Sequence, residues 1–169
     1  MRRLGREDLV GLKIFAAIVA CGLLPLSALA QSAAPPPAPV MVASPAEVAA
    51  AAARVKAKGG TAMVLEPLVS SPSRRAVIEY RSQPTPASTH EAVDEIITVV
   101  EGGGTIILGG ALRDETRRSE TERSGTGIDG GKTYPLEKGT YLLIPAGTAH
   151  YFASIGPQGL TIVTMKAPK

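Results

Sequence analysis

The residues best suited to chemistry in this chain are its only two histidines, His90 and His150, and one glutamate, Glu95. Each histidine lies between turn-forming and strand-forming residues, and Glu95 opens the strand-like run 95–100. Imidazole and carboxylate groups bind divalent first-row transition metals, and two histidines with one carboxylate form a known iron-binding face. A buried carboxylate without a partner is costly, and a cation would compensate its charge. These side chains therefore predict a metal site, whose affinity should fall at low pH, where imidazole is protonated.

The elements that must position these residues are short strand-like segments, separated by glycine and proline, from Thr61 onward. Such segments with turn residues between them are typical of an all-β sandwich or barrel. The predicted strands cover residues 61–69, 74–82, 95–100, 105–112, 132–137, 140–144, 149–155 and 160–166. We interpret the mixed-charge segment 113–120 as a solvated loop, or alternatively as a mobile lid over a pocket. The glycine-rich segment 125–130 is interpreted as a hairpin connection, because no helix pattern follows it.

Two motifs contain the candidate ligands. The first pairs a histidine with a glutamate and a glycine at the positions His90, Glu95 and Gly102. The second has the spacing glycine, five residues, Pro-x-Gly, two residues and histidine, and it is formed by Gly139, Pro145, Gly147 and His150. The segment 82–154 therefore resembles the cupin superfamily, whose members are small jelly-roll β-barrels. The resemblance implies that residues 61–169 form one such barrel.

Three positions depart from the cupin pattern. Ser88 stands where the first histidine of the motif is expected, Ser82 replaces the opening glycine, and Ser154 replaces an asparagine. The resemblance therefore implies three of the four usual ligands, His90, Glu95 and His150, for a divalent transition metal such as Fe, Mn, Ni or Zn.

Strand alternation predicts which neighbours of these ligands face the same side. Ser88 should share a face with His90, Ile97 and Val99 with Glu95, and Phe152 and Ser154 with His150. We therefore expect a pocket lined by Ser88, Ile97, Val99, Phe152 and Ser154, mostly apolar with a polar end. Such a pocket suits a small-molecule ligand.

The first thirty residues have the pattern of a secretory signal peptide. Basic residues precede the apolar run 14–24, and Ala28-Leu29-Ala30 has the form of a cleavage site. Cleavage there would start the mature protein at Gln31, remove Cys21 and leave no stable membrane anchor. A membrane anchor is the alternative, although the run is short for a span. The sequence around Cys21 also loosely resembles a lipobox, and Arg2-Arg3 forms an incomplete twin-arginine pattern.

Between this segment and the strands lie a predicted linker and a predicted helix. Residues 31–43 are rich in proline and alanine and predict a semi-rigid linker. Ser44, Pro45 and Glu47 form a helix-start pattern, and Gly59-Gly60 ends the helix predicted over 44–60. Its apolar face is mostly alanine, so we interpret it as a solvated arm, with a docking or dimer-contact helix as the alternative.

The composition makes some classes of partner and of stabilising site unexpected. The net charge of the 169-residue chain is +3, partly because of the basic N-terminal segment, and aromatic residues make up only 4%. So few aromatics make nucleic-acid binding unexpected. With one cysteine, neither a disulfide framework nor a cysteine-rich zinc site is expected.

The sequence thus leads to an all-β, jelly-roll (cupin) β-barrel with an N-terminal signal peptide, a Pro-rich linker and a short helix. We expect a periplasmic or secreted metal-binding protein that binds or acts on a small molecule in the barrel, whether as an oxygenase, isomerase or decarboxylase or without catalysis. A metal-free binding or sensing module is the alternative. Exposed strand edges predict a homodimer.

Overall fold

A computed structural model of the chain describes residues 39–169. The signal peptide predicted over 1–30, Cys21 and most of the linker predicted over 31–43 lie outside the described residues. Within 39–169, no helix is long and apolar enough to cross a membrane.

The predicted helix forms as α1 (Pro45–Lys58), with the helix-start pattern working as a capping box. The Ser44 hydroxyl accepts a hydrogen bond from the Glu47 backbone N–H, and the Glu47 carboxylate accepts one from the Ser44 backbone N–H. Both backbone donors would otherwise lack a partner at the helix start. Gly59 follows the last turn at a φ of 46°, where glycine is favoured.

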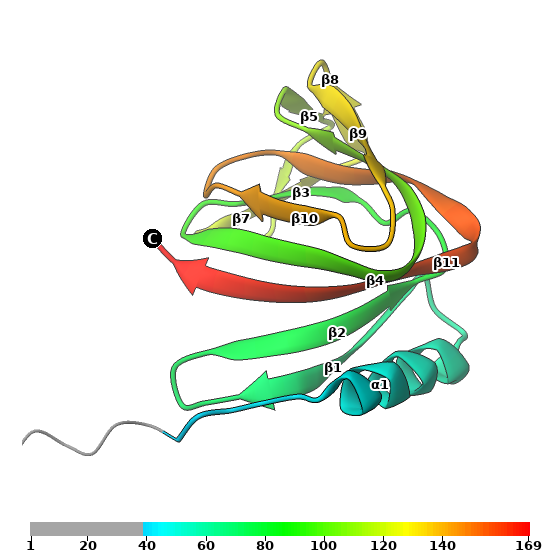
Figure 1. Cartoon of the computed structure of the whole chain (residues 1–169). Coiled ribbons are helices and arrows are strands. Elements are labelled where there is room, and N and C mark those ends of the chain that lie inside the picture. Colours follow the sequence, from blue (N-terminus) through cyan, green and yellow to red (C-terminus); the bar gives the residue numbers. More distant parts are fainter. Residues whose placement is uncertain (1–38) are drawn as a thin grey trace, which may run out of the picture. The chain divides into compact units, whose positions relative to one another are not determined.

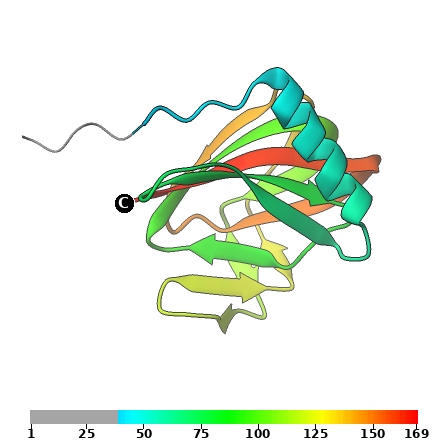
Figure 2. The ribbon, with the colours of Figure 1, turned by 90° about the horizontal axis from the view of Figure 1, so that it is seen from below.

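The interpretation of this helix as a solvated arm is wrong. Ala51, Ala52 and Val55 are buried, and they form one apolar cluster with Ile78. Figure 2 shows α1 lying across the strands of one sheet. The small alanine side chains allow the helix to approach the sheet closely, so a weakly amphipathic sequence still buries a continuous stripe.

Ala52→Asp should therefore destabilise the protein while Ala53→Asp does not. Ala52 is 4% exposed and Ala53 is exposed. A carboxylate forced into the apolar contact should cost about 2–4 kcal/mol. Urea denaturation of the two variants measures this difference, and equal midpoints would show that the helix is not held to the sheet.

The strands form two layers that share their two longest members (Figure 1). The strands are β1 (Met63–Ser70), β2 (Arg75–Arg81), β3 (Ala87–His90), β4 (Val93–Leu108), β5 (Ala111–Arg113), β6 (Thr116–Arg117), β7 (Glu122–Gly125), β8 (Gly127–Asp129), β9 (Lys132–Leu136), β10 (Tyr141–Ile144) and β11 (His150–Pro168). The first half of β4 and the second half of β11 pair with each other, with β2 and β1 beyond β11 and β10 beyond β4. The other halves continue into the second layer with β9, β3, β7 and β6.

Two predicted pairs of strands are each one continuous strand. The run 95–100 and the first part of the run 105–112 merge into β4, which ends at Leu108, and the runs 149–155 and 160–166 merge into β11. The glycines between them bend the chain rather than end the strand, as the shifted register between Ile155 and Leu160 indicates.

The segment 113–120 is exposed throughout, as predicted, although it is not all loop, because Thr116–Arg117 form the short strand β6. The residues after it form β7, which pairs antiparallel with β3 so that Glu122 faces His90. The following glycine-rich segment contains β8, which pairs with β5 and makes a small two-stranded sheet. The charged residues of this region form exposed ion pairs, such as Arg123 with Glu115. Its mixed charge is therefore compatible with strand pairing.

The hydrophobic core fills one part of the interior between the two layers. Its buried members come from four strands: Ile97, Val99, Ile106, Leu136, Ile144, Phe152, Leu160 and Ile162. The side chains of β2 alternate between this interior and the helix. Ile78 packs under α1, whereas Glu79 and Arg81 line a cavity on the inner face. One end of the interior is therefore filled by packed apolar side chains, which we call the solid core, and the other end contains the cavity.

Candidate metal centre

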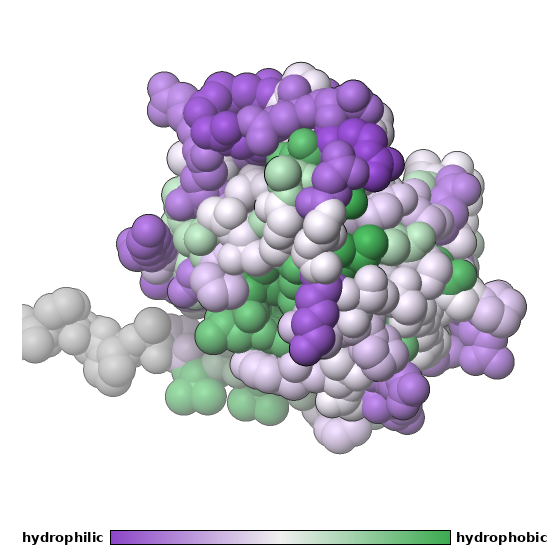
Figure 3. All heavy atoms as spheres, turned by 90° about the horizontal axis from the view of Figure 1, so that it is seen from above, coloured by the Kyte–Doolittle hydropathy of each residue, from purple (hydrophilic) through white to green (hydrophobic). Residues whose placement is uncertain are grey.

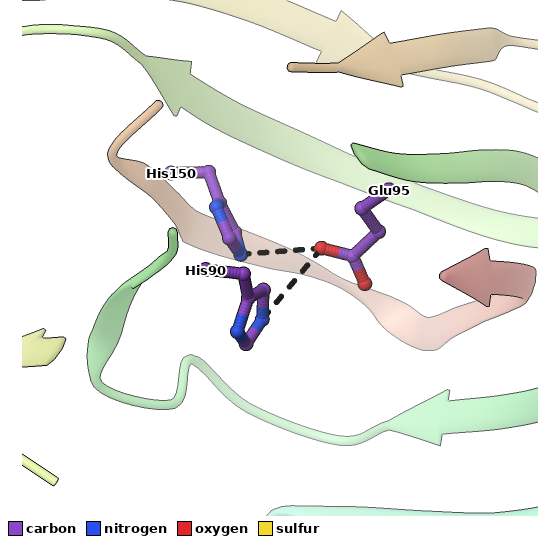
Figure 4. Close-up of side chains that lie close together, drawn as sticks. All are labelled: His90, Glu95 and His150. Carbon is purple, nitrogen blue, oxygen red and sulfur yellow. Dashed lines mark ion pairs between the residues drawn. The ribbon is translucent and has the colours of Figure 1, made fainter. Parts of the chain in front are cut away.

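The three predicted ligands converge at the inner end of this cavity. His90 ends β3, Glu95 lies near the start of β4, and His150 begins β11. Each offers one ligand atom, and these three atoms lie within 4.8 Å of one another. Figure 4 shows both imidazole rings pointing toward the Glu95 carboxylate. His150 Nε2 is 3.4 Å and His90 Nε2 is 3.9 Å from Glu95 Oε2.

The turn before His150 holds the three strand ends together. The Gly147 backbone N–H donates a hydrogen bond to the His90 carbonyl over 2.8 Å. The Ala146 backbone N–H donates to Asp94 Oδ1, also over 2.8 Å. Gly147 has a φ of 82°, a conformation that favours glycine. The Pro-x-Gly turn thus joins the end of β3 to the start of β4 and places His150 between them.

Neighbouring groups hold the outer atoms of Glu95 and His150, those that do not face the centre. Thr164 donates a hydrogen bond to Glu95 Oε1 over 3.0 Å, which leaves Oε2 directed at the histidines. His150 Nδ1 is 3.2 Å from the Thr148 carbonyl, an acceptor, so this nitrogen carries the hydrogen and Nε2 presents its lone pair. His90 Nδ1 lies 3.3 Å from Glu122 Oε1 but makes no hydrogen bond among the described residues. Such outer contacts orient metal ligands in proteins.

Burial favours the neutral form of both imidazoles, which is the form that binds metals. His150 is 5% and Glu95 is 9% exposed. Removal from water lowers the pKa of His90, and the nearby Lys166 charge lowers it further. Burial also lowers the pKa of His150, against the opposing effect of Glu95.

The donor set fits a divalent transition metal. Glu95 Oε2 is buried and has no hydrogen-bond partner among the described residues. An uncompensated buried carboxylate oxygen is unfavourable. Ligand atoms bound at about 2.1 Å from one ion stand roughly 3–4 Å apart, which matches the two distances to Oε2. His90, Glu95 and His150 are therefore a group that could hold a metal ion.

Of the five residues predicted to line the pocket, Ser88 does so. Its hydroxyl donates a hydrogen bond to His150 Nε2 over 3.0 Å. Ile97, Val99 and Phe152 face the interior but lie in the solid core. Ser154 is exposed and contacts Thr105, because the register of β11 shifts between Phe152 and Ser154 and reverses the alternation.

Sequence reasoning missed an ion pair in the wall of the cavity. Glu79 and Arg81 are paired, and both line the cavity with the metal-binding group. Burial raises the pKa of Glu79, although the Arg81 charge opposes this. The alternation of 74–82 carried the signal, since Val77, Glu79 and Arg81 occupy one face and Ile78 and Tyr80 the other.

Ser88→His should strengthen metal binding, because Ser88 stands directly opposite His150 in the pairing of β3 with β11. A fourth ligand should tighten binding by about tenfold or more. Ser88→Ala is the matched control, since it removes the hydroxyl and adds no ligand. Competition with a chromogenic chelator measures the affinities, and unchanged or weaker binding by the histidine variant would contradict the geometry.

No protein-family model matches the chain, and no curated protein matches it. Among solved structures, hydroquinone 1,2-dioxygenase PnpCD is similar with a TM-score of 0.50 and 17% identity, over 78% of this chain and 81% of that chain. KdgF from Halomonas sp. aligns at 19% identity and a TM-score of 0.45, over 65% of this chain and 83% of that chain. The cupin domain of Schizosaccharomyces pombe Cnp3 aligns at 12% identity and a TM-score of 0.45, over 65% and 67%. The predicted cupin jelly-roll fold is confirmed.

Proposed function

We propose that this chain is an exported metal-binding protein that binds or acts on a small molecule in the cavity of its cupin barrel. The observation that carries the proposal is the convergence of His90, Glu95 and His150 at the inner end of that cavity. The cavity measures about 860 Å³, which is within the range of small-molecule sites. Three protein ligands also leave coordination positions for such a molecule.

The proposed metal is a divalent transition ion, Fe, Mn, Ni or Zn, because the ligands are two imidazoles and a carboxylate. The structure of hydroquinone 1,2-dioxygenase to which this fold is similar is a complex with Cd²⁺ and 4-hydroxybenzonitrile. A bound metal would supply Lewis-acid chemistry. The chain itself supplies the neutral imidazoles, the carboxylate fixed by Thr164 and the closed apolar end of the barrel.

The second candidate is a metal-free binding or sensing module, and Ser88 favours it. Its hydroxyl donates to His150 Nε2 and so satisfies, without any ion, the nitrogen that would bind the metal. Ser88 does not reach Glu95 Oε2, which has no hydrogen-bond partner among the described residues. A bound metal would give this oxygen a partner, whereas a metal-free module would leave it without one.

Metal content decides between them. The purified protein would be stripped with a chelator, supplied with Fe²⁺, Mn²⁺, Ni²⁺ or Zn²⁺ in turn, and analysed by elemental mass spectrometry after dialysis. We expect roughly one ion per chain for at least one metal, together with a higher melting temperature. Retention of none of the four would support the metal-free module.

Export is proposed from residues 1–30, which carry the basic segment, apolar run and Ala28-Leu29-Ala30 site of a signal peptide. Mass spectrometry of the periplasmic or secreted protein should find Gln31 at its N-terminus. A full-length product confined to the cytoplasm would contradict this.

A homodimer is proposed from the strand edges. β1 and β10 each pair on one side only among the described strands. Two side chains of β10, Tyr141 and Leu143, are 63% and 59% exposed. Hydrophobic atoms also reach the surface on the face shown in Figure 3. Light scattering over a concentration series should give twice the monomer mass, and a constant monomer mass would refute the dimer.

A further inference from the structure

The cavity beside the metal-binding group carries an excess of positive charge. Its lining contains four cationic side chains, Arg74, Arg75, Arg81 and Lys166, against two carboxylates, Glu79 and Glu95. A divalent ion at the group would raise this excess further. A cleft lined by one sign of charge concentrates ligands of the opposite sign.

Arg81 is the least exposed member of this cationic set, with 11% of its side chain exposed, and it is fixed on three sides. Its Nε donates to Glu79 Oε1 and its Nη1 to the Thr85 hydroxyl. Its guanidinium carbon lies 3.9 Å from the centre of the Phe152 ring. Within residues 39–169 its side chain makes no other hydrogen bond, so Nη2 keeps its donor capacity. A rigid guanidinium loses little freedom when it binds an anion.

Arg81 also lies close to the metal-binding group. The Phe152 ring under it is two residues from His150 on β11, and Arg81 lines the same cavity as the three predicted ligands. A ligand at the inner end of the cavity would therefore meet the three metal ligands and this guanidinium together.

We propose that the cavity binds a small organic carboxylate, with its charged group on Arg81 and its apolar part against Met63, Leu65 and Val77. This inference rests on the proposed function, because the carboxylate would be the ligand of the same cavity. A single negative charge suits the site, since Arg81 is its least exposed cation and two of its three nitrogens are already engaged. The outer cations Arg74, Arg75 and Lys166 are exposed and would draw the anion in.

The test compares mandelate with its uncharged amide, mandelamide, by calorimetry on the metal-free and the Zn²⁺-loaded protein. We expect mandelate to bind at least about tenfold more tightly than mandelamide in both forms, because charge-assisted hydrogen bonds are the stronger ones. Glycolate, which lacks the apolar ring, should bind more weakly than mandelate. Tighter binding of phenyl phosphate than of mandelate would overturn the carboxylate assignment.

The decisive variant is the double change Glu79→Gln with Arg81→Gln. It removes the whole ion pair, so the net charge is kept and no buried carboxylate is left alone. Mandelate affinity should fall about tenfold, whereas Arg118→Gln, an exposed arginine outside the cavity lining, should leave it unchanged.

The outcomes separate the two proposals. If Zn²⁺ fails to bind but the metal-free protein still prefers mandelate to mandelamide, the carboxylate site stands and the metal centre does not. If Zn²⁺ binds but neither form prefers the acid, or the double variant binds mandelate like wild type, the carboxylate site is overturned.

Discussion

Glu95→Gln should abolish metal binding while leaving the metal-free protein at least as stable as wild type. The amide has the size of the carboxylate but a much weaker affinity for a cation, so metal affinity should fall by more than about a hundredfold. In the metal-free state the same change removes a buried charge whose Oε2 atom has no hydrogen-bond partner. The free energy of unfolding should therefore stay constant or rise. Chelator competition and urea denaturation measure the two effects.

Glu101→Gln is the matched control. Glu101 lies on the same strand, is exposed and pairs with Lys56 over 3.1 Å, so its loss should change neither quantity by much. His150→Ala should also release the metal while the circular dichroism spectrum keeps its β-type shape, because His150 lies outside the solid core. Metal retained by Glu95→Gln, or an unfolded Glu95→Gln protein, would show that Glu95 is a structural residue and not a ligand.

Local patterns were sufficient to predict which ligands come together. The Pro145-x-Gly147 turn is stabilised by short-range hydrogen bonds, such as that from the Thr148 N–H to the Pro145 carbonyl. His90 and Glu95 are separated by a short connection, so they stay close in any pairing of their strands. The prediction needed only the assumption that the turn meets this connection, and the bond from Gly147 to the His90 carbonyl provides that contact.

Alternation along a strand could not show which part of the interior is filled. Ile97 and Val99 face inward as predicted, but Leu136 and Ile144 from β9 and β10 pack against them and close that end. The open end is bounded instead by β2, whose Glu79 and Arg81 belong to a different strand pair. These contacts are non-local, so period-two patterns give the face of a residue and not its neighbours.

The helix α1 likewise shows that local sequence patterns do not predict contacts between distant segments. Its capping box depends on residues three apart and was readable in the sequence, whereas its docking depends on Ile78 and Val64 in strands that follow later. An alanine-rich face has little hydrophobic contrast of its own, and it becomes a packing surface only when a matching sheet face is present.

Among glycine-to-alanine substitutions in the barrel, Gly102→Ala should cause the largest loss of stability. Gly102 lies where β4 passes from one layer to the other, at a φ of 75°. A Cβ there would stand 1.9 Å from the Gly159 carbonyl oxygen, which is backbone and cannot swing away. The positive φ alone costs an alanine about 1–2 kcal/mol, and the clash should bring the total above about 3 kcal/mol.

Gly139→Ala separates the two causes, because Gly139 has a φ of 90° but no heavy atom within 4 Å of its would-be Cβ. It should lose only the conformational part, about 1–2 kcal/mol. Both glycines belong to the motifs around the ligands, yet they are required for different reasons: Gly139 for a turn, and Gly102 for the close approach of β4 to β11. If urea denaturation gives both variants the same loss, the close approach at Gly102 is not what holds the two layers in register.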